Sequence, residues 1–331
     1  MPPSPSSREA ALEVDGLVKA YRGRRVVDGL SLTAAAGAVT AVLGPNGAGK
    51  TTTVECCAGL RSPDAGAVRV LGLDRGRHAA VLRARVGVML QDGGLPNGAR
   101  AGEVLRHVAA LHERPLPVAA LLDELGLADH AGTTVRRLSG GQRRRLALAC
   151  AVVGRPELVF LDEPSAGLDP QSRLAAWGLV ERLRDAGAAI VLTTHLMEEA
   201  ERLADLVVVV DAGRVVAEGS PRALVSGRAG TDGRGPGTDG RGPGGDALRF
   251  AARPGIDLSG LRAAVPAGTC VEEPLPGRYV VQLTDGAPLG PQVLATVTAW
   301  CASQDVMPEG LTLGTRTLED VFLDLTGRAL R

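Results

Sequence analysis

The stretch Gly44-Pro-Asn-Gly-Ala-Gly-Lys-Thr-Thr52 decides the fold of this 331-residue chain. It follows an apolar run, Val39–Leu43, and precedes a segment, Thr51–Gly59, that we predict to be helical. A strand, a glycine-rich loop and a helix in this order fit the phosphate-loop pattern G-x-x-x-x-G-K-[ST] at every fixed position. Glycines let successive backbone N–H groups converge on phosphate oxygens, and the helix N-terminus adds a favourable dipole. The sequence therefore predicts a nucleotide site, with Lys50 on the β- and γ-phosphates and the Thr51 hydroxyl on Mg²⁺.

Composition limits what the rest of the chain can be. Hydrophobic residues make up 45% and charged residues 22%, an ordinary globular composition, and the length suffices for one large and one small domain. Lys+Arg and Asp+Glu each number 37, so no net charge favours nucleic acid or an anionic membrane surface. We therefore predict no nucleic-acid partner.

Cysteine usage and the lack of long apolar runs predict a protein of a reducing compartment. The five cysteines are odd in number and lack C-x-x-C spacing, which argues against a disulfide framework and a zinc site. Residues 1–10 are rich in Pro and Ser without an apolar core, so we expect a disordered N-terminus rather than a signal peptide. No run approaches about 18 apolar residues, so we expect no membrane span.

Two carboxylates follow the apolar strand that we predict at Leu158–Leu161. Asp162 and Glu163 stand at its carboxyl end, where open α/β sheets place their ligands. Adjacent acids can divide the work, with Asp162 supporting Mg²⁺ and Glu163 polarising a water molecule. Exposed turn acids are common after strands, but the upstream loop that needs Mg²⁺ favours the functional interpretation.

The pentapeptide Leu138-Ser-Gly-Gly-Gln142 precedes a strongly helical segment, Arg143–Val153. Ser139 is the type of residue that caps a helix N-terminus, and a Ser-Gly-Gly turn that opens a helix presents N–H groups to an anion. The chain therefore holds a second candidate anion site besides the phosphate loop.

Four further residues give little evidence of function when each is considered alone. Tyr21 follows a predicted strand, Gln91 ends another, Asp169 lies in a turn before a predicted helix, and His195 follows the apolar run Ala188–Thr193. Each is compatible with an ordinary structural role, so only their order along the chain gives them meaning.

That order resembles one family. The phosphate loop, the pentapeptide, the strand-end carboxylates and the four residues above follow the arrangement of ATP-binding-cassette (ABC) ATPases, and residues 12–226 resemble that family throughout. Within the family, Val191–Glu201 and Thr317–Gly327 are similar to the separate ATP-binding subunit of type-2, daunorubicin-resistance-like exporters.

The resemblance implies a role for each motif in binding and hydrolysing ATP. Tyr21 would stack on adenine, Gln91 would sense the metal and the water, and His195 would contact the γ-phosphate. The residues that it implies for nucleotide binding are Tyr21, Gly44, Pro45, Asn46, Gly47, Ala48, Gly49, Lys50, Thr51, Thr52, Ser139, Gly140, Gly141, Gln142 and Asp169. The implied catalytic residues are Glu163, His195 and Gln91, and the implied Mg²⁺-supporting residues are Thr51, Gln91 and Asp162.

The resemblance also implies partners. Ser139 and Gly141 would bind the γ-phosphate of ATP held by a second copy, and Asp169 would bridge the two copies. Hydrolysis would then require a head-to-tail homodimer with two ATP molecules at its interface. An integral membrane permease, contacted near Gln91, would carry the substrate, which would place this chain on the cytoplasmic face of the cell membrane as a peripheral subunit.

The fold class that we predict is α/β, a P-loop NTPase core of the ABC type at 11–226 with an α-helical subdomain at about 92–145. Within that subdomain the pattern is helical over Gly102–Leu127. Residues 227–245 contain two copies of Thr-Asp-Gly-Arg-Gly-Pro-Gly, a composition that predicts a flexible linker. Residues 246–331 show the order β-α-β-β-α-β, which predicts a small ferredoxin-like α+β domain with a regulatory or dimer-supporting role.

We therefore predict the ATPase subunit of an exporter of a drug, an antibiotic or a lipid-like compound. A soluble ABC ATPase of translation is the first alternative, but such proteins usually carry two cassettes, and only one phosphate loop is present here. A DNA-repair ABC ATPase is the second, but the interval from Lys50 to Leu138 is too short for a long coiled-coil insertion. A kinase would lack the pentapeptide.

Overall fold

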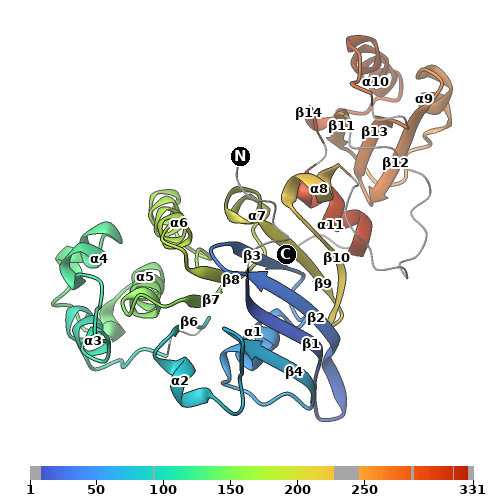
Figure 1. Ribbon diagram of the computed structural model, residues 1–331. Helices are drawn as coiled ribbons and strands as arrows, with labels where there is room; N and C mark the ends of the chain where they lie inside the picture. The colour runs from blue at the N-terminus through green and yellow to red at the C-terminus, as the bar shows by residue number, and fades with distance from the viewer. Residues whose placement is uncertain (1–8, 92–93, 227–245, 285–286, 316, 327–331) are drawn as a thin grey trace. The chain divides into compact units, whose positions relative to one another are not determined.

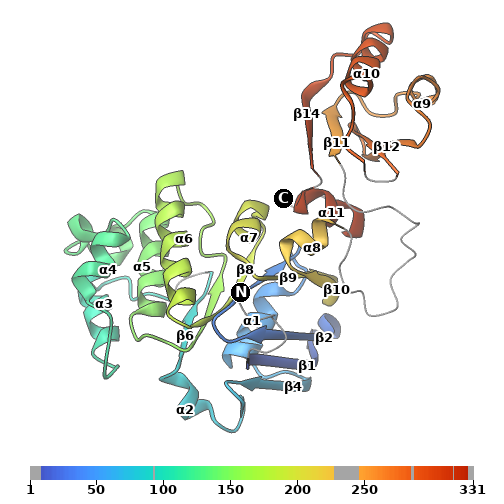
Figure 2. The ribbon, with the colours of Figure 1, turned by 45° about the horizontal axis from the view of Figure 1, so that its top comes forward.

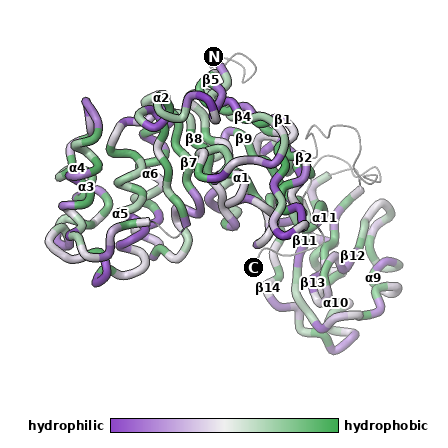
Figure 3. The backbone as a smooth tube through the Cα atoms, turned by 90° about the horizontal axis from the view of Figure 1, so that it is seen from below, coloured by the Kyte–Doolittle hydropathy of each residue, from purple (hydrophilic) through white to green (hydrophobic). Residues whose placement is uncertain are grey.

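A six-stranded sheet carries the phosphate loop at its centre (Figure 1). Its order is β10-β9-β3-β8-β7-β6, and the neighbours from β9 to β6 run parallel. Three of its strands are buried along their whole length, as parallel strands covered on both faces should be, and hydrophobic residues line β7 and β8 in Figure 3. The strands are β3 (Val39–Leu43), β6 (Val86–Met89), β7 (Leu158–Asp162), β8 (Ala189–Thr194), β9 (Leu206–Asp211) and β10 (Arg214–Gly219).

The computed structural model describes residues 9–91, 94–226, 246–284, 287–315 and 317–326. The chain divides into two compact units, Met1–Val215 and Val216–Leu330. The tandem repeat that predicts a linker lies outside the described residues. No helix in the described ranges is long and apolar enough to cross a lipid bilayer.

A second sheet, antiparallel and ordered β2-β1-β4-β5, shares its core with the first. Helix α1 (Lys50–Ala58) contributes Val54, Cys56 and Cys57 to this core, and both sheets pack against it. The phosphate loop is therefore anchored by a helix that is held on two sides. The strands are β1 (Ala10–Tyr21), β2 (Arg24–Ala35), β4 (Ala65–Val70) and β5 (Leu73–Asp74), so that β1 begins at the last residue of the segment predicted to be disordered.

Separate helices form the predicted helical subdomain (Figure 2). The helical pattern over Gly102–Leu127 is divided into α3 (Ala101–Ala109) and α4 (Val118–Glu124). Pro115 and Pro117 lie between them, and proline both removes a backbone donor and disfavours helix in the residue before it. The other helices of this unit are α2 (Ala79–Arg83), α5 (Gly140–Val152), α6 (Pro170–Asp185) and α7 (Met197–Leu203), with 3₁₀ turns at Ala128–His130 and Val135–Arg137.

The second unit contains a four-stranded antiparallel sheet in the order β12-β13-β11-β14. Its core includes the stacked rings of Phe250 and Tyr279, whose centroids are 5.1 Å apart. Helix α8 packs against α11 in this unit, although it lies within the range 11–226 that the sequence assigns to the ATP-binding domain. The elements are α8 (Pro221–Val225), β11 (Asp246–Ala251), α9 (Ser259–Ala264), β12 (Thr269–Leu275), β13 (Arg278–Leu283), α10 (Pro291–Ser303), β14 (Glu309–Thr315) and α11 (Leu318–Thr326).

Candidate nucleotide site

The phosphate loop needs its glycines because the backbone is crowded there. Gly49 has a φ of 99°, and an added Cβ would lie 2.6 Å from the Val26 carbonyl oxygen. At Gly44 an added Cβ would lie 2.4 Å from the Val210 carbonyl oxygen. Larger residues at either position would have to displace backbone of the neighbouring strands. The loop conformation is thus fixed by packing against β2 and β9, not by its own sequence alone.

Gly49→Ala is expected to weaken ATP binding and to lower the free energy of unfolding by about 1–3 kcal/mol, the range for one strained backbone position. Gly29→Ala is the control, because Gly29 also has a positive φ, 74°, but its added Cβ meets no atom within 4 Å. Urea unfolding and equilibrium titration with ATP measure both effects. Equal losses in the two variants would show that the clash with Val26 is unimportant.

Lys50 begins α1 and lies inside the loop with 6% of its surface exposed. Its Nζ donates hydrogen bonds to the carbonyl oxygens of Gly44 at 2.7 Å and Pro45 at 3.2 Å. Burial lowers the pKa of this ammonium group, while the charges of Glu163 and Asp162 act in the opposite direction. A cation desolvated in this way, beside convergent backbone N–H groups, is suited to an anionic ligand.

Thr193, near the end of β8, bonds the Asp162 side chain and the Glu163 backbone at the end of β7. Its hydroxyl donates to Asp162 Oδ1, and the backbone N–H of Glu163 donates to the Thr193 hydroxyl and carbonyl oxygens at 3.1 Å each. None of the sequence motifs assigns Thr193 to the site. The only sequence signal is the Thr-Thr pair that precedes His195. The parallel pairing of β7 with β8 brings it to the site.

Glu163 and His195 form a close pair at the same edge of the sheet. Glu163 Oε2 lies 3.0 Å from His195 Nδ1, and 11% of the Glu163 side chain is exposed against 30% for His195. Glu163 also has a φ of 52°, a left-handed backbone that is uncommon outside glycine. Such strain persists where surrounding contacts enforce it, and it concentrates at functional sites.

Asp162 and Thr51 present oxygen ligands of the kind that Mg²⁺ prefers. Burial raises the pKa of Asp162, and the hydroxyls of Thr193 and Thr51 offset only part of that effect. Asp162 Oδ2 is buried without a partner of normal hydrogen-bond geometry in the described ranges. Such an oxygen can accept a water or a cation. Among the described residues, no three His, Cys, Asp or Glu side chains are grouped to hold a metal. Phosphate oxygens and water would therefore have to complete the coordination shell of Mg²⁺.

The pentapeptide forms the start of α5, separate in sequence from the phosphate loop. Ser139 Oγ accepts the Gln142 N–H at 3.1 Å, and Gln142 Oε1 accepts the Ser139 N–H at 2.8 Å, which makes a capping box. Gln142 Nε2 lies 2.8 Å from His130 Nε2. Ser139 and Gly140 are exposed, whereas the Cα of Gly141 faces Leu168. The Gln142 N–H is taken by this cap, so the N–H groups of Gly140 and Gly141 are the ones that α5 can offer to a ligand from outside the chain.

The remaining predicted residues lie at the borders of the site. Tyr21 ends β1 with 36% of its surface exposed, and Arg61 Cζ lies 5.6 Å from its ring centroid. Gln91 is exposed two residues beyond Met89, which pairs with Leu161, so that it shares the sheet edge with the carboxylates. Asp169 caps α6 by accepting the Ser172 N–H at 2.9 Å and the Ser172 hydroxyl at 2.7 Å.

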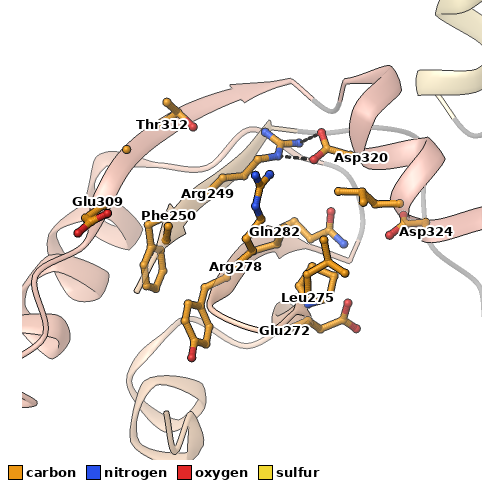
Figure 4. A pocket seen from close by; sticks show the side chains of 16 residues that line it. Arg249, Phe250, Glu272, Leu275, Arg278, Gln282, Glu309, Thr312, Asp320 and Asp324 are labelled. Atoms are coloured by element: carbon orange, nitrogen blue, oxygen red, sulfur yellow. Dashed lines mark hydrogen bonds and ion pairs between the residues drawn. The ribbon is translucent and has the colours of Figure 1, made fainter. Parts of the chain in front are cut away.

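A separate cavity of about 360 Å³ lies within the second unit (Figure 4). Its lining mixes two arginines with four carboxylates, and Arg249 is already paired with Asp320, with Nε 2.8 Å from Oδ1. Arg278 at its border is 59% exposed and lies 3.5 Å from Glu319. The mixed charges favour no single class of ligand.

Comparisons with known proteins identify relatives of this chain. The family described as ABC transporter matches residues 27–166. The daunorubicin/doxorubicin resistance ATP-binding protein DrrA of Streptomyces peucetius is 44% identical over 224 residues, 65% of this chain and 67% of that protein. The daunorubicin resistance ATP-binding protein DrrA3 of Streptomyces coeruleorubidus is 37% identical over 324 residues, 96% of each chain.

Two further matches are another relative and a solved structure. The Nod factor export ATP-binding protein I of Ralstonia nicotianae is 36% identical over an alignment of 355 residues, 100% of this chain and 98% of that protein. A solved ATP-binding subunit of an ABC transporter superposes with a TM-score of 0.61 at 30% identity, covering 67% of this chain and 95% of the other.

Proposed function

This chain belongs to the family of ABC transporter ATP-binding subunits, and from that premise we propose that it powers an exporter as a head-to-tail homodimer bound to a separate membrane permease. As an ABC ATPase it binds ATP and hydrolyses it to ADP and phosphate to drive transport. The observation that carries the dimer proposal is the division of the site. One part gathers Lys50, Glu163 and His195, while Ser139 is exposed on α5 with its helix N-terminus open to a second chain.

The contacts of the site residues support the roles that we propose for them. Glu163 is the group that accepts a proton from the attacking water, since it is the carboxylate paired with His195 and only 11% exposed. His195 holds Glu163 in orientation through their 3.0 Å contact and would contact the γ-phosphate of bound ATP. Mg²⁺, when bound with ATP, would neutralise phosphate charge, and Thr51, Asp162 and Gln91 are the residues that would support it.

The remaining contacts to the nucleotide follow the motifs. Gly44–Thr52 would cradle the phosphates, Tyr21 would stack on adenine, and Ser139 to Gln142 of the second copy would close over the γ-phosphate. Asp169, which orders the start of α6, would bridge the two copies. These assignments are supported by the exposure of Tyr21, Ser139 and Gly140 at positions where a ligand or a second chain can reach them.

We propose a ferredoxin-like class for the second unit. The order β12-β13-β11-β14 with antiparallel neighbours, and one helix in each of the two crossovers, supports this assignment. The two long relatives, DrrA3 and the Nod factor export protein, align over this unit as well. A regulatory or dimer-supporting role for the unit fits the fact that the nucleotide motifs all lie in the first one.

The exporter assignment is tested by binding to membranes. We expect the purified chain to sediment with membranes that contain its permease and to stay in the supernatant with membranes that lack it, because the chain would be a peripheral subunit on the cytoplasmic face. Permease-dependent stimulation of ATP hydrolysis is the second readout. Equal sedimentation with both kinds of membrane, or a rate of ATP hydrolysis that is the same with and without the permease, would contradict the proposal.

A further inference from the structure

Glu199 is a buried acid with no place in the site described above. It lies on α7, four residues after His195, and only 1% of its surface is exposed. In the described part of the chain, the other buried acids are Asp162 and Glu163, which have roles at the nucleotide. A carboxyl group in such a position is costly unless its oxygens are satisfied or it stays neutral.

Its main partner is Trp177 on α6. The indole Nε1 donates a hydrogen bond to Glu199 Oε1 at 2.9 Å, and Trp177 is only 2% exposed. The hydroxyl groups of Ser165 and Thr194 lie near enough to oppose the rise in its pKa, although Ser165 Oγ and Glu199 Oε2 are buried without a hydrogen bond in the described residues. Thr194 Oγ1 accepts the Leu196 N–H at 2.9 Å, which ties Thr194 to the residue that precedes α7. Residues from three segments around the site therefore meet at one carboxyl group.

Exposed and partly exposed charges surround the buried bond on both helices. The Arg173 and Arg202 guanidinium groups lie 5.9 and 5.1 Å from the Trp177 ring. Arg173 pairs with Glu198 at 3.6 Å, and Arg202 pairs with Glu181 at 3.2 Å. Exposed pairs of this kind contribute little to stability. The specific link between the two helices is thus the hydrogen bond from Trp177 to Glu199.

The position of this link in the chain gives it a function. Helix α6 begins at the Asp169 cap, directly after the loop that holds Ser165, and α7 begins two residues after His195. Both helices pack against β8, as Figures 1 and 2 show. A shift of α6 or its loop would therefore reach His195 through Glu199.

We propose that Glu199, bound by Trp177, is a positioning residue that couples the Ser165–Asp169 loop to His195 and so aligns the Glu163–His195 pair when a second copy closes the site. This inference rests on the proposed dimer mechanism and extends it, because the loop ending at Asp169 is the one assigned to the subunit interface. Glu199 does not touch the nucleotide in this arrangement; it acts through Ser165, Thr194 and the helix that follows His195.

The tests are Glu199→Leu, Glu199→Gln and Trp177→Phe, with Glu198→Gln as the matched control on the exposed side of the same helix. We expect Glu199→Leu to lower kcat by about 10–10²-fold, the effect of misplacing a reacting group by about 1 Å, with KM for ATP changed less than about twofold. Trp177→Phe should lower kcat in the same direction. Glu199→Gln should recover most of the activity, because an amide keeps the shape and the acceptor for the indole N–H. Glu198→Gln should match the wild type.

The experiment distinguishes a failure of the Glu199 coupling role from a failure of the proposed ATPase function. If the wild type hydrolyses ATP and Glu199→Leu retains its kcat, the coupling role is wrong while the ATPase assignment stands. A parallel rise in KM and loss of folded protein in Trp177→Phe would indicate a structural role only. A wild type without ATPase activity beside its permease would instead contradict the function itself.

The pH dependence of stability gives an independent prediction. Burial raises the pKa of Glu199 above 4.5, and the nearby His195 charge and the hydrogen bonds only partly oppose it. The stabilisation from the neutral acid is therefore complete below about pH 4.5 and is lost as the pH rises toward the folded pKa. The amide of Glu199→Gln has no proton to lose in this pH range. The urea midpoint of this variant should therefore rise relative to that of the wild type as the pH increases from 5 to about 8. A constant difference would show that Glu199 is charged in the folded protein.

Discussion

Glu163→Gln is expected to bind ATP as the wild type does and to lose about 10²–10⁴-fold in turnover, the usual contribution of a general base. The amide has nearly the same shape as the carboxylate, and the backbone bonds from Glu163 to Thr193 do not involve its side chain. An amide cannot accept the proton of the attacking water at neutral pH. Because the nucleotide is then bound but not consumed, the variant should accumulate as an ATP-bound dimer.

The measurement combines ATPase assay, equilibrium ATP binding and size-exclusion chromatography with Mg²⁺-ATP. Glu157→Gln is the matched control, since Glu157 immediately precedes the same strand but pairs with Arg85 at 2.6 Å, and 54% of its side chain is exposed. Exposed pairs contribute about 0–1 kcal/mol, so this variant should hydrolyse ATP normally. Turnover at the wild-type rate in Glu163→Gln would exclude Glu163 as the base.

Much of the fold follows from sequence patterns because the informative signals are local. The apolar runs at β3, β7 and β8 predict buried parallel strands, and each proves to be buried along its length. The polar residues that follow these strands then meet at one sheet edge through strand pairing. Apolar periodicity alone does not divide the helical pattern over Gly102–Leu127, where Pro115 and Pro117 separate two helices.

The parts that could not be predicted depend on contacts between distant segments. Thr193 joins the site because β8 pairs with β7, and nothing in the Thr-Thr dipeptide indicates which hydroxyl faces Asp162. Trp177 and Glu199 lie on separate amphipathic helices, and helical periodicity predicts only that both face inward. Their mutual hydrogen bond depends on how α6 crosses α7, which periodicity does not encode.

Two inactive variants, one defective in the phosphate loop and the other in the pentapeptide, are expected to form one intact nucleotide site when they combine in a mixed dimer. Lys50→Ala removes the buried ammonium group from the chain's own phosphate loop. Gly141→Asp places a carboxylate where the γ-phosphate of the other copy would bind, and the fold can accept it, since an added Cβ would lie 3.4 Å from Leu168 Cδ2, an ordinary contact. Like charges at that point should prevent closure over ATP.

A mixed dimer of these two single variants keeps one complete site, formed by the loop of the Gly141→Asp chain and the pentapeptide of the Lys50→Ala chain. A mixed dimer of wild type with the double variant keeps none, because each of its sites contains one defect. If each site lay within a single chain, the order would be reversed. Comparing the two mixed dimers therefore distinguishes a site formed by two chains from a site formed within one chain. The result does not depend on the absolute activity of either dimer.

Occluded ATP is the appropriate readout, because hydrolysis could require both sites to be intact. With Glu163→Gln in every chain and two affinity tags to isolate mixed dimers, we expect about one ATP per dimer for the paired single variants and almost none for wild type with the double variant. Gly132→Asp is the control, since Gly132 is exposed in the same subdomain and its added Cβ meets nothing within 4 Å. Occlusion by the dimer of wild type with the double variant would place the whole site in one chain and leave Ser139 and Gly141 without their proposed role.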